Sequence, residues 1–166
     1  DCTGHGVPGA LLSILGMTLL KTLISRTYTL DPSQVLNHMR EHIMHALGQR
    51  GSLKEPRDGI DMALCRIDFR EHLLEYAGAF HPLYLVRNAC LKVIPGDPMP
   101  VGIGSEQERS FTSTRIQLVA GDMLYLFSDG FADQFGGPHG KKYKYNAFRS
   151  LITNLAAMPV AAQKQH

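Results

Sequence analysis

The spacing of apolar residues changes near residue 60, and this change limits the possible folds more than any other feature of the sequence. Leucine recurs every fourth residue over Leu11–Leu23, which predicts a helix from about Pro8 to Tyr28. An Asp-Pro pair then predicts a second, capped helix over Asp31–Leu47. After residue 60, short apolar runs alternate with turn residues, as in an antiparallel sheet. The order of elements therefore favours an α+β fold over alternating βαβ units.

Six strands and one further helix are expected after the two helices. The strands are placed at Ile60–Ile67, Leu73–Ala79, Leu83–Val86, Leu91–Ile94, Ser110–Leu118 and Met123–Phe127, and the helix at Asn146–Ala157. The run Met123–Phe127 has no polar face, so we expect a central strand that is buried on both sides.

The first helix is apolar on more than one side, so we expect it to lie between a sheet and other structure. Its longest apolar stretch, Gly9–Leu20, is shorter than the about 20 residues that a bilayer crossing needs. We therefore expect a buried helix rather than a membrane anchor. The apolar face of the second helix, which includes Met39, Ile43 and Met44, is expected to form core.

The composition indicates one globular domain over residues 1–166, since 44% of the residues are hydrophobic and only 19% are charged. A net charge of +2 and the lack of tryptophan argue against a nucleic-acid-binding protein, which needs a concentrated basic face with stacking aromatic residues. Cys2, Cys65 and Cys90 are odd in number and lack Cys-x-x-Cys spacing. This argues against disulfides and zinc knuckles and favours a reducing cytoplasm.

Asp129 directly follows the most apolar predicted strand and precedes Gly130. Its carboxylate would emerge where the backbone turns away from a sheet, which is a suitable position for a ligand of Mg²⁺ or Mn²⁺. The alternative is that this Asp-Gly pair only forms a turn.

Asp1 precedes a glycine-rich segment that leads into the first helix. Glycines let the backbone approach an ion closely, and a helix N-terminus favours negative charge. The alternative is an ordinary capped lead-in to the helix. His5 by itself more often bonds to backbone groups than to a metal.

Four segments together resemble the motifs of SpoIIE-like domains in the PPM class of protein phosphatases. In chain order they read DCTGHGVPGA (1–10), YAGAFHPLYL (76–85), MPVGI (99–103) and GDMLYLFSDG (121–130). They occur in the order of the family and span nearly the whole chain, so chance agreement is a poor explanation.

The resemblance implies a four-layer α-β-β-α sandwich with antiparallel sheets, incomplete in this chain, and a site for two Mn²⁺ or Mg²⁺ ions. It assigns metal binding to Asp1, to the backbone carbonyl of Cys2, where the family has glycine, and to Asp129. Asp1 and Asp129 are therefore expected to lie near one another. The resemblance also implies that a metal-bound water attacks the phosphorus, so no catalytic side-chain nucleophile is expected.

Two carboxylates of the family pattern are absent from these 166 residues. One belongs to a Gly-Asp motif before the position of Asp1 and the other to an Asp-Asp motif after the last helix. We therefore expect weak metal binding and negligible activity for this chain alone. We also expect self-association through unpaired strand edges, and a poorly placed Asp1, because chain ends fray.

The segment after Gly130 is basic, and Lys141 and Lys142 lie in a glycine-rich stretch close to Asp129 in sequence. These lysines are candidates for holding an acidic, phosphorylated partner. The alternative is a solvated loop without a partner.

The resemblance suggests a cytoplasmic phosphatase that acts on phosphoserine or phosphothreonine in a bacterial signalling protein, with a sensory domain upstream. The suggested substrate is an anti-sigma-factor antagonist. The main rival is a catalytically silent PPM-like module that only binds a partner protein.

Overall fold

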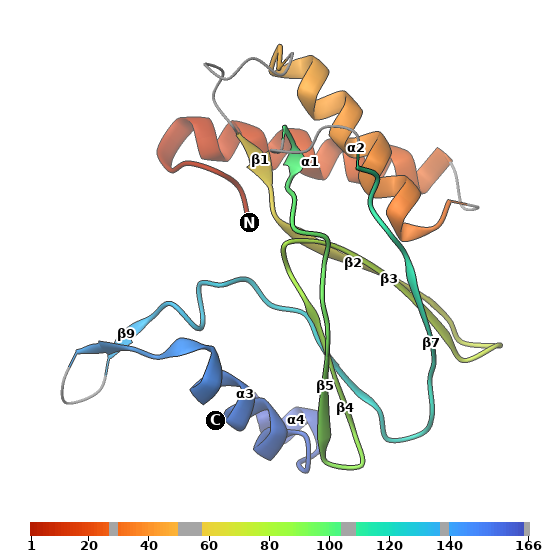
Figure 1. Cartoon of the computed structure of the whole chain (residues 1–166), viewed down its shortest axis with the longest axis vertical. Helices are drawn as coiled ribbons and strands as arrows, with labels where there is room; N and C mark the ends of the chain where they lie inside the picture. Colours follow the sequence, from red (N-terminus) through yellow and green to blue (C-terminus); the bar gives the residue numbers. More distant parts are fainter. Residues whose placement is uncertain (27–29, 50–57, 104–108, 137–139, 165–166) are drawn as a thin grey trace. The chain divides into compact units, whose positions relative to one another are not determined.

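A computed structural model describes residues 1–26, 30–49, 58–103, 109–136 and 140–164 of the chain (Figure 1). The chain forms two compact units, which are described separately. The first unit comprises Asp1–Pro82 and Pro95–Leu118, and the second comprises Leu83–Ile94 and Val119–His166. The elements are helical and antiparallel, so the α+β class predicted from the sequence is confirmed.

The first unit contains both predicted N-terminal helices and two small antiparallel sheets. Its elements are α1 (Gly6–Arg26), α2 (Pro32–Ala46), β1 (Gly59–Ile60), β2 (Met62–Asp68), β3 (Leu73–Ala79), β6 (Val101–Gly102) and β7 (Thr114–Gln117). Strand β1 pairs with β6, and the other sheet has the order β2-β3-β7. The predicted end of the first helix at Tyr28 lies outside the described residues.

Helix α2 begins at the cap that the sequence predicts. The Asp31 carboxylate accepts hydrogen bonds from the backbone N–H groups of Ser33 and Gln34, at 2.8 and 3.2 Å. The Gln34 side chain in turn accepts a bond from the Asp31 N–H at 2.9 Å, which completes a capping box. These contacts satisfy N–H groups that have no partner within the helix.

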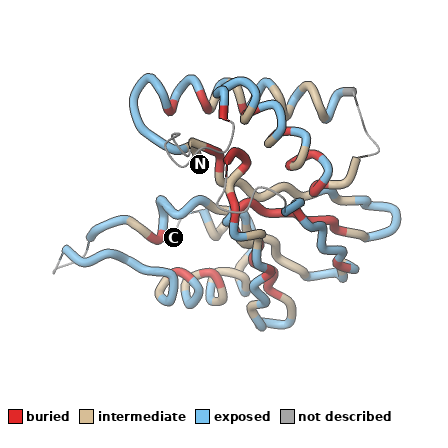
Figure 2. Tube along the Cα trace, turned by 45° about the horizontal axis from the view of Figure 1, so that its top comes forward, coloured by how far each residue is buried: buried red, intermediate tan, exposed pale blue. Residues whose placement is uncertain are grey.

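The core of the first unit lies between the inner faces of the helices and the strands (Figure 2). Helix α2 contributes its predicted apolar face, of which Leu36 and Ile43 are fully buried. Helix α1 contributes Leu12 and approaches β1 closely at Gly16. A Cβ atom on Gly16 would lie 2.4 Å from the end of the Ile60 side chain, so a larger residue at position 16 would force that side chain to move.

The outer face of α1 corrects the sequence-based prediction of a helix that is covered on more than one side. Its apolar side chains are exposed, namely Val7, Leu11, Ile14, Met17 and Ile24. Among the described residues, one segment, Gly6–Ser25, has the length and hydropathy that a membrane crossing requires. Apolar periodicity shows which sides of a helix can be buried, whereas burial also depends on what packs there. Core helices of water-soluble proteins share this composition, so these properties assign no membrane role.

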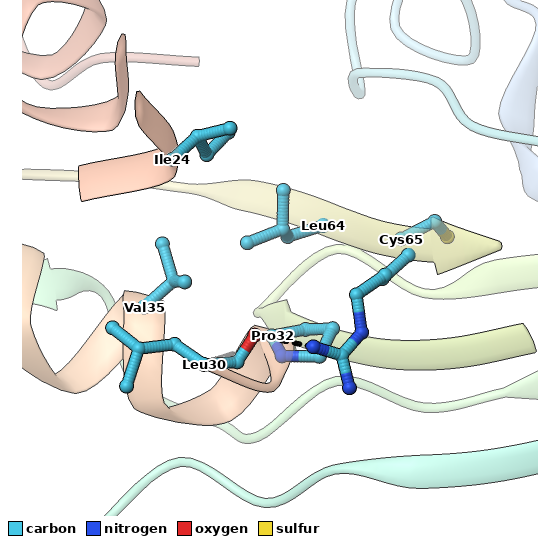
Figure 3. A pocket seen from close by; sticks show the side chains of 7 residues that line it. Ile24, Leu30, Pro32, Val35, Leu64 and Cys65 are labelled. Atoms are coloured by element: carbon cyan, nitrogen blue, oxygen red, sulfur yellow. Dashed lines mark hydrogen bonds between the residues drawn. The ribbon is translucent and has the colours of Figure 1, made fainter. Parts of the chain in front are cut away.

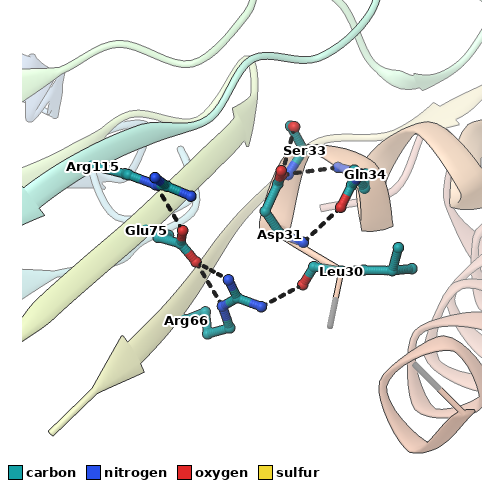
Figure 4. Close-up of polar contacts among 7 residues, drawn as sticks. All are labelled: Leu30, Asp31, Ser33, Gln34, Arg66, Glu75 and Arg115. Atoms are coloured by element: carbon teal, nitrogen blue, oxygen red, sulfur yellow. Dashed lines mark hydrogen bonds and ion pairs between the residues drawn. The ribbon is translucent and has the colours of Figure 1, made fainter. Parts of the chain in front are cut away.

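A ladder of three charged residues crosses the β2-β3-β7 sheet (Figure 4). The register places Arg66 and Arg115 on either side of Glu75. The nearly buried Glu75 carboxylate accepts bonds from the Nε atoms of Arg66 at 2.6 Å and Arg115 at 2.9 Å. Arg66 Nη1 also donates to the carbonyl of Leu30 at 2.8 Å, so the ladder holds the segment before α2 against the sheet.

The second unit is built on a three-stranded antiparallel sheet with β4 at its centre. Its elements are β4 (Leu83–Arg87), β5 (Cys90–Ile94), β8 (Met123–Tyr125), β9 (Phe135–Gly136), β10 (Lys141–Lys142), α3 (Lys144–Leu155) and α4 (Val160–Gln163). Tyr84 and Val86 of β4 pack against Phe148 and Ile152 of α3. Phe127 joins this core through edge-to-face contacts with Tyr84 and Phe148.

The prediction that Met123–Phe127 is a central, fully buried strand is wrong. Strand β8 ends at Tyr125 and lies at the edge of its sheet, where it pairs with β4. Its residues are half-buried, and Leu126 is exposed. A uniformly apolar run shows that a strand tolerates burial, but pairing partners decide whether it occupies the centre or the edge of a sheet.

The buried face of α2 provides a test of this core through a matched pair of methionines. Met39 is 1% exposed and Met17 on α1 is 57% exposed. Replacing Met39 with Ala should lower the free energy of unfolding by about 2–5 kcal/mol, because it leaves a cavity. Met17→Ala should change it by less than about 0.5 kcal/mol. Urea unfolding followed by circular dichroism measures both, and equal effects would contradict the described core.

Candidate functional site

The first residues of the chain pair with the strand that contains β1. The Asp1 ammonium group donates to the Asp61 carbonyl at 2.7 Å, and the Asp61 N–H donates to the Asp1 carbonyl at 2.8 Å. Two residues on, the Thr3 N–H donates to the Gly59 carbonyl at 3.0 Å. The expectation of a frayed Asp1 is therefore wrong, because both of its backbone groups are held by the neighbouring strand.

Cys2 lies opposite Ile60 in this antiparallel pairing. The hydrogen bonds run through the residues on either side of Cys2, so its own carbonyl points away from β1. The Cys2 thiol accepts a bond from the Ser13 hydroxyl at 3.2 Å and packs against the core. The Cys2 carbonyl thus takes no part in the pairing with β1, while the side chain has a structural role.

Asp61 is a candidate ligand that the sequence analysis missed. It exchanges both backbone hydrogen bonds with Asp1, so the two residues are a directly opposed pair with side chains on the same face. Two carboxylates on one face of a strand pair are the type of ligand that Mn²⁺ or Mg²⁺ prefers. The sequence gives little indication of a ligand here, because Asp61 is a single polar residue between two apolar runs.

The glycines after Asp1 allow the chain to turn sharply into α1. Gly4 and Gly6 have positive φ angles of 88° and 66°, which other residues rarely adopt. A Cβ atom on Gly9 would lie 2.9 Å from the Gly4 carbonyl oxygen. The predicted glycine-rich lead-in to the helix is confirmed, and its glycines are needed to bring the start of α1 close to the segment of Asp1.

In the second unit, Asp129 lies in the turn region that follows β8 and is exposed. Its carbonyl accepts a bond from the Asp133 N–H at 2.9 Å. Burial raises the pKa of Tyr145, and the negative charges of Asp129 and Asp133 raise it further. Both carboxylates therefore lie close enough to Tyr145 to act on its hydroxyl electrostatically.

The strand before Asp129 is held at its start by an ion pair. The Arg87 guanidinium donates two bonds to the Asp122 carboxylate, at 2.8 and 2.7 Å. Asp122 also accepts a bond from the Val119 N–H at 3.0 Å. The bond from Arg87 lowers the pKa of Asp122, whose carboxylate is thus engaged by Arg87 and by the turn at Val119.

The two predicted substrate-binding lysines form β10 of a short hairpin that the sequence analysis missed. Lys142 Nζ lies 2.7 Å from the Asp133 carboxylate, whereas Lys141 is exposed opposite Gly136 on β9. The hairpin is joined to the segment after Asp129 by the Lys144 N–H, which donates to the Ala132 carbonyl at 2.8 Å. A lysine ammonium group thus lies beside the Asp129–Asp133 segment.

The first unit also contains an apolar pocket of about 240 Å³ (Figure 3). Its lining residues are Ile24, Leu30, Pro32, Val35, Leu64, Cys65 and Arg66. Burial raises the pKa of the Cys65 thiol to about 11, so the thiol is protonated and a poor nucleophile at neutral pH. None of the described residues that line this pocket carries a carboxylate, which is the ligand that Mg²⁺ or Mn²⁺ prefers.

The predicted metal ligands fall into two groups. Asp1 and Cys2 lie together in the first unit, and Asp129 lies in the second. Their convergence on one site stays a prediction. In the described ranges, no three histidine, cysteine, aspartate or glutamate side chains gather closely enough to hold a metal ion.

Comparison with known proteins identifies the family. The family model of stage II sporulation protein E matches residues 1–166. The chain belongs to the SpoIIE family. Its similarity to the SiaA-PP2C domain of Pseudomonas aeruginosa has a TM-score of 0.81 at 27% identity and covers 99% of this chain and 63% of that one. The comparison with curated protein sequences gave no match.

Two other solved structures share the fold. A Bacillus subtilis chain with the PP2C phosphatase domain and a regulatory-domain fragment of SpoIIE has a TM-score of 0.68 at 19% identity; 96% of this chain and 42% of that chain are covered. A Mycobacterium tuberculosis chain with RsbU and RsbW domains has a TM-score of 0.67 at 24% identity, with 98% and 42% covered. The present chain thus spans less than two thirds of each of these relatives.

Asp61 allows a test of the paired carboxylates in the first unit. If Mn²⁺ is added at about ten times its Kd for the wild-type chain, the free energy of unfolding should rise by about 1.4 kcal/mol. At the same Mn²⁺ concentration the rise should be clearly smaller for Asp61→Asn, because one of the two opposed carboxylates is lost. Urea unfolding with and without Mn²⁺ measures the gain.

The control is Asp68→Asn, since Asp68 accepts turn hydrogen bonds from Arg70 and Glu71 that asparagine can also accept. Equal stabilisation of wild type and Asp61→Asn by Mn²⁺ would remove Asp61 from the site.

Proposed function

We propose that this chain is part of a metal-dependent phosphatase that removes phosphate from serine or threonine residues of a signalling protein. The observation that carries the proposal is the SpoIIE family match over residues 1–166, which includes both acidic motifs of the chain. The geometry supports it, because Asp129 is exposed just after β8 and Asp1 is held by its backbone opposite Asp61.

The proposed ligands fit a hard divalent cation such as Mn²⁺ or Mg²⁺. Asp1 and Asp129 offer exposed carboxylates, and the Cys2 carbonyl points away from its strand partner. Such ions, when bound, lower the pKa of water and neutralise charge on a phosphoryl group. The chain itself holds the carboxylates in place, and the raised pKa of Cys65 argues against a thiolate nucleophile at that position.

The proposed arrangement of the complete enzyme is a four-layer α-β-β-α sandwich in which Asp1 and Asp129 meet at one edge. The similarity to the Pseudomonas aeruginosa domain supports this arrangement. Because the chain covers 63% of that domain, we propose that further metal carboxylates come from residues outside these 166. Alone, this chain is proposed to bind metal weakly and to self-associate through open strand edges such as that of β8.

The proposed substrate is a phosphoserine on an anti-sigma-factor antagonist in the bacterial cytoplasm, under control of a sensory domain in the same protein. The proposal rests on the family match, and a chain that contains an RsbU domain beside an RsbW domain shares the fold. The silent binding module remains the second candidate. Its basis is that these 166 residues contain only two carboxylates of the family pattern, Asp1 and Asp129.

The two candidates differ in what Asp129→Asn does to the full-length protein. Asparagine forms an Asp-Gly-type turn as well as aspartate does, so the fold should remain while a charged ligand is lost. We expect Mn²⁺-dependent hydrolysis of a phosphoserine peptide to fall by about a hundredfold or more. Asp68→Asn is the control and should keep full activity. Unchanged turnover by Asp129→Asn, with intact circular dichroism, would show that Asp129 is only a turn residue.

The basic hairpin is tested by comparing two substrates. Lys141→Ala and Lys142→Ala in the full-length protein should each raise KM for an acidic phosphopeptide by about two- to fivefold, as expected for partly exposed ion pairs. KM for p-nitrophenyl phosphate should not change, because this small ester has no acidic flanks. The control is Lys92→Ala on β5, at the opposite edge of the sheet from β8. Equal KM values for wild type and both hairpin variants would remove the hairpin from substrate binding.

A further inference from the structure

The solvent-facing side of α2 carries a group of side chains that the proposed phosphatase does not use. Helix α2 buries Met39 and Ile43 in the core of the first unit. Its opposite side exposes His38, Glu41, His42 and His45. We propose that His38 and His42 bind one borderline divalent cation, with Zn²⁺ as the representative ion.

The spacing of the two histidines suits a shared ligand. Residues four apart lie on the same face of a helix, on adjacent turns, so both imidazoles can reach one ion. Side chains in a helix also lean back toward the preceding turn, which brings the His42 ring over the turn that contains His38. Paired histidines at this spacing bind zinc on the helices of metalloproteases.

The ring contacts give a second, independent observation. His42 Nδ1 lies 2.7 Å from the His38 carbonyl oxygen. A carbonyl only accepts hydrogen bonds, so this nitrogen carries the proton and the lone pair of His42 is on Nε2. His38 Nδ1 faces the Glu41 carboxylate at 3.7 Å. Metal-binding histidines characteristically direct one ring nitrogen to a carbonyl or carboxylate and bind the ion through the other.

The chemistry of the pair selects the ion. Imidazole suits Zn²⁺, Cu²⁺ and Ni²⁺, whereas Mg²⁺ and Mn²⁺ prefer oxygen ligands. The site formed by His38 and His42 is therefore distinct from the proposed carboxylate site, where Mn²⁺ is expected.

The order His-x-x-Glu-His over residues 38–42 also occurs in one class of zinc peptidases. A catalytic site needs a further protein ligand, and no cluster of three metal-binding side chains occurs in the described part of the chain. Water would complete the coordination of an ion on α2. The inference is therefore a two-histidine binding site without hydrolytic activity.

The proposal is tested by titrating Zn²⁺ into the 166-residue chain and measuring Kd and stoichiometry by isothermal calorimetry. We expect one Zn²⁺ per chain. His38→Ala and His42→Ala should each weaken binding by about tenfold or more, because each removes one of the two protein ligands. Both positions are exposed, so circular dichroism should show an unchanged fold.

Two controls separate this site from others. His72→Asn removes an exposed histidine elsewhere, at a positive φ of 49° that asparagine tolerates, and should bind Zn²⁺ like wild type. Asp129→Asn should also keep Zn²⁺ binding, so failure of the phosphatase proposal is distinguishable from failure of this one. Absence of Zn²⁺ binding by the folded wild type, or equal binding by wild type and both α2 variants, would overturn the proposal.

Discussion

The backbone pairing of Asp1–Thr3 with Gly59–Asp61 is the contact on which the candidate site of the first unit depends. It holds Asp1 by both of its backbone groups and directs the Cys2 carbonyl away from β1. It also positions the turn at Gly4 and Gly6, which leads into α1, and α1 packs through Gly16 against Ile60. One short stretch of antiparallel pairing thus positions a proposed ligand and seats the first helix on the core.

A second constraint is that the proposed ligands belong to different units. The chain passes from the first unit to the second between Pro82 and Leu83, returns at Pro95 and crosses again after Leu118. The end of the first unit before Leu83 is closely packed, because Tyr76 donates to the His81 carbonyl at 2.5 Å and a Cβ atom on Gly78 would lie 2.1 Å from the Tyr76 hydroxyl oxygen. The second of the four family motifs, residues 76–85, therefore spans the boundary between the two units, and no metal ligand is assigned to it.

Local signals in the sequence predicted much of the fold, and long-range pairing accounts for most of what they missed. The cap at Asp31 and the alternation in β3 depend on neighbouring residues, so both elements were placed closely. The edge position of β8 depends on pairing across the chain, which an apolar run does not encode. Asp61 was missed for the same reason, since only its pairing partner Asp1 makes it notable. The residues carrying the family resemblance were recognisable because their order along the chain is itself a pattern.

The central claim is that Asp1 and Asp129 bind the same divalent-metal cluster. A crystal structure of the full-length protein grown with Mn²⁺, with the ions located by anomalous scattering, tests it most directly. We expect Mn²⁺ in direct contact with both carboxylates and with the Cys2 carbonyl, at one edge of two stacked sheets. Carboxylates of Asp1 and Asp129 on opposite faces of the protein, or Mn²⁺ bound at neither residue, would contradict it.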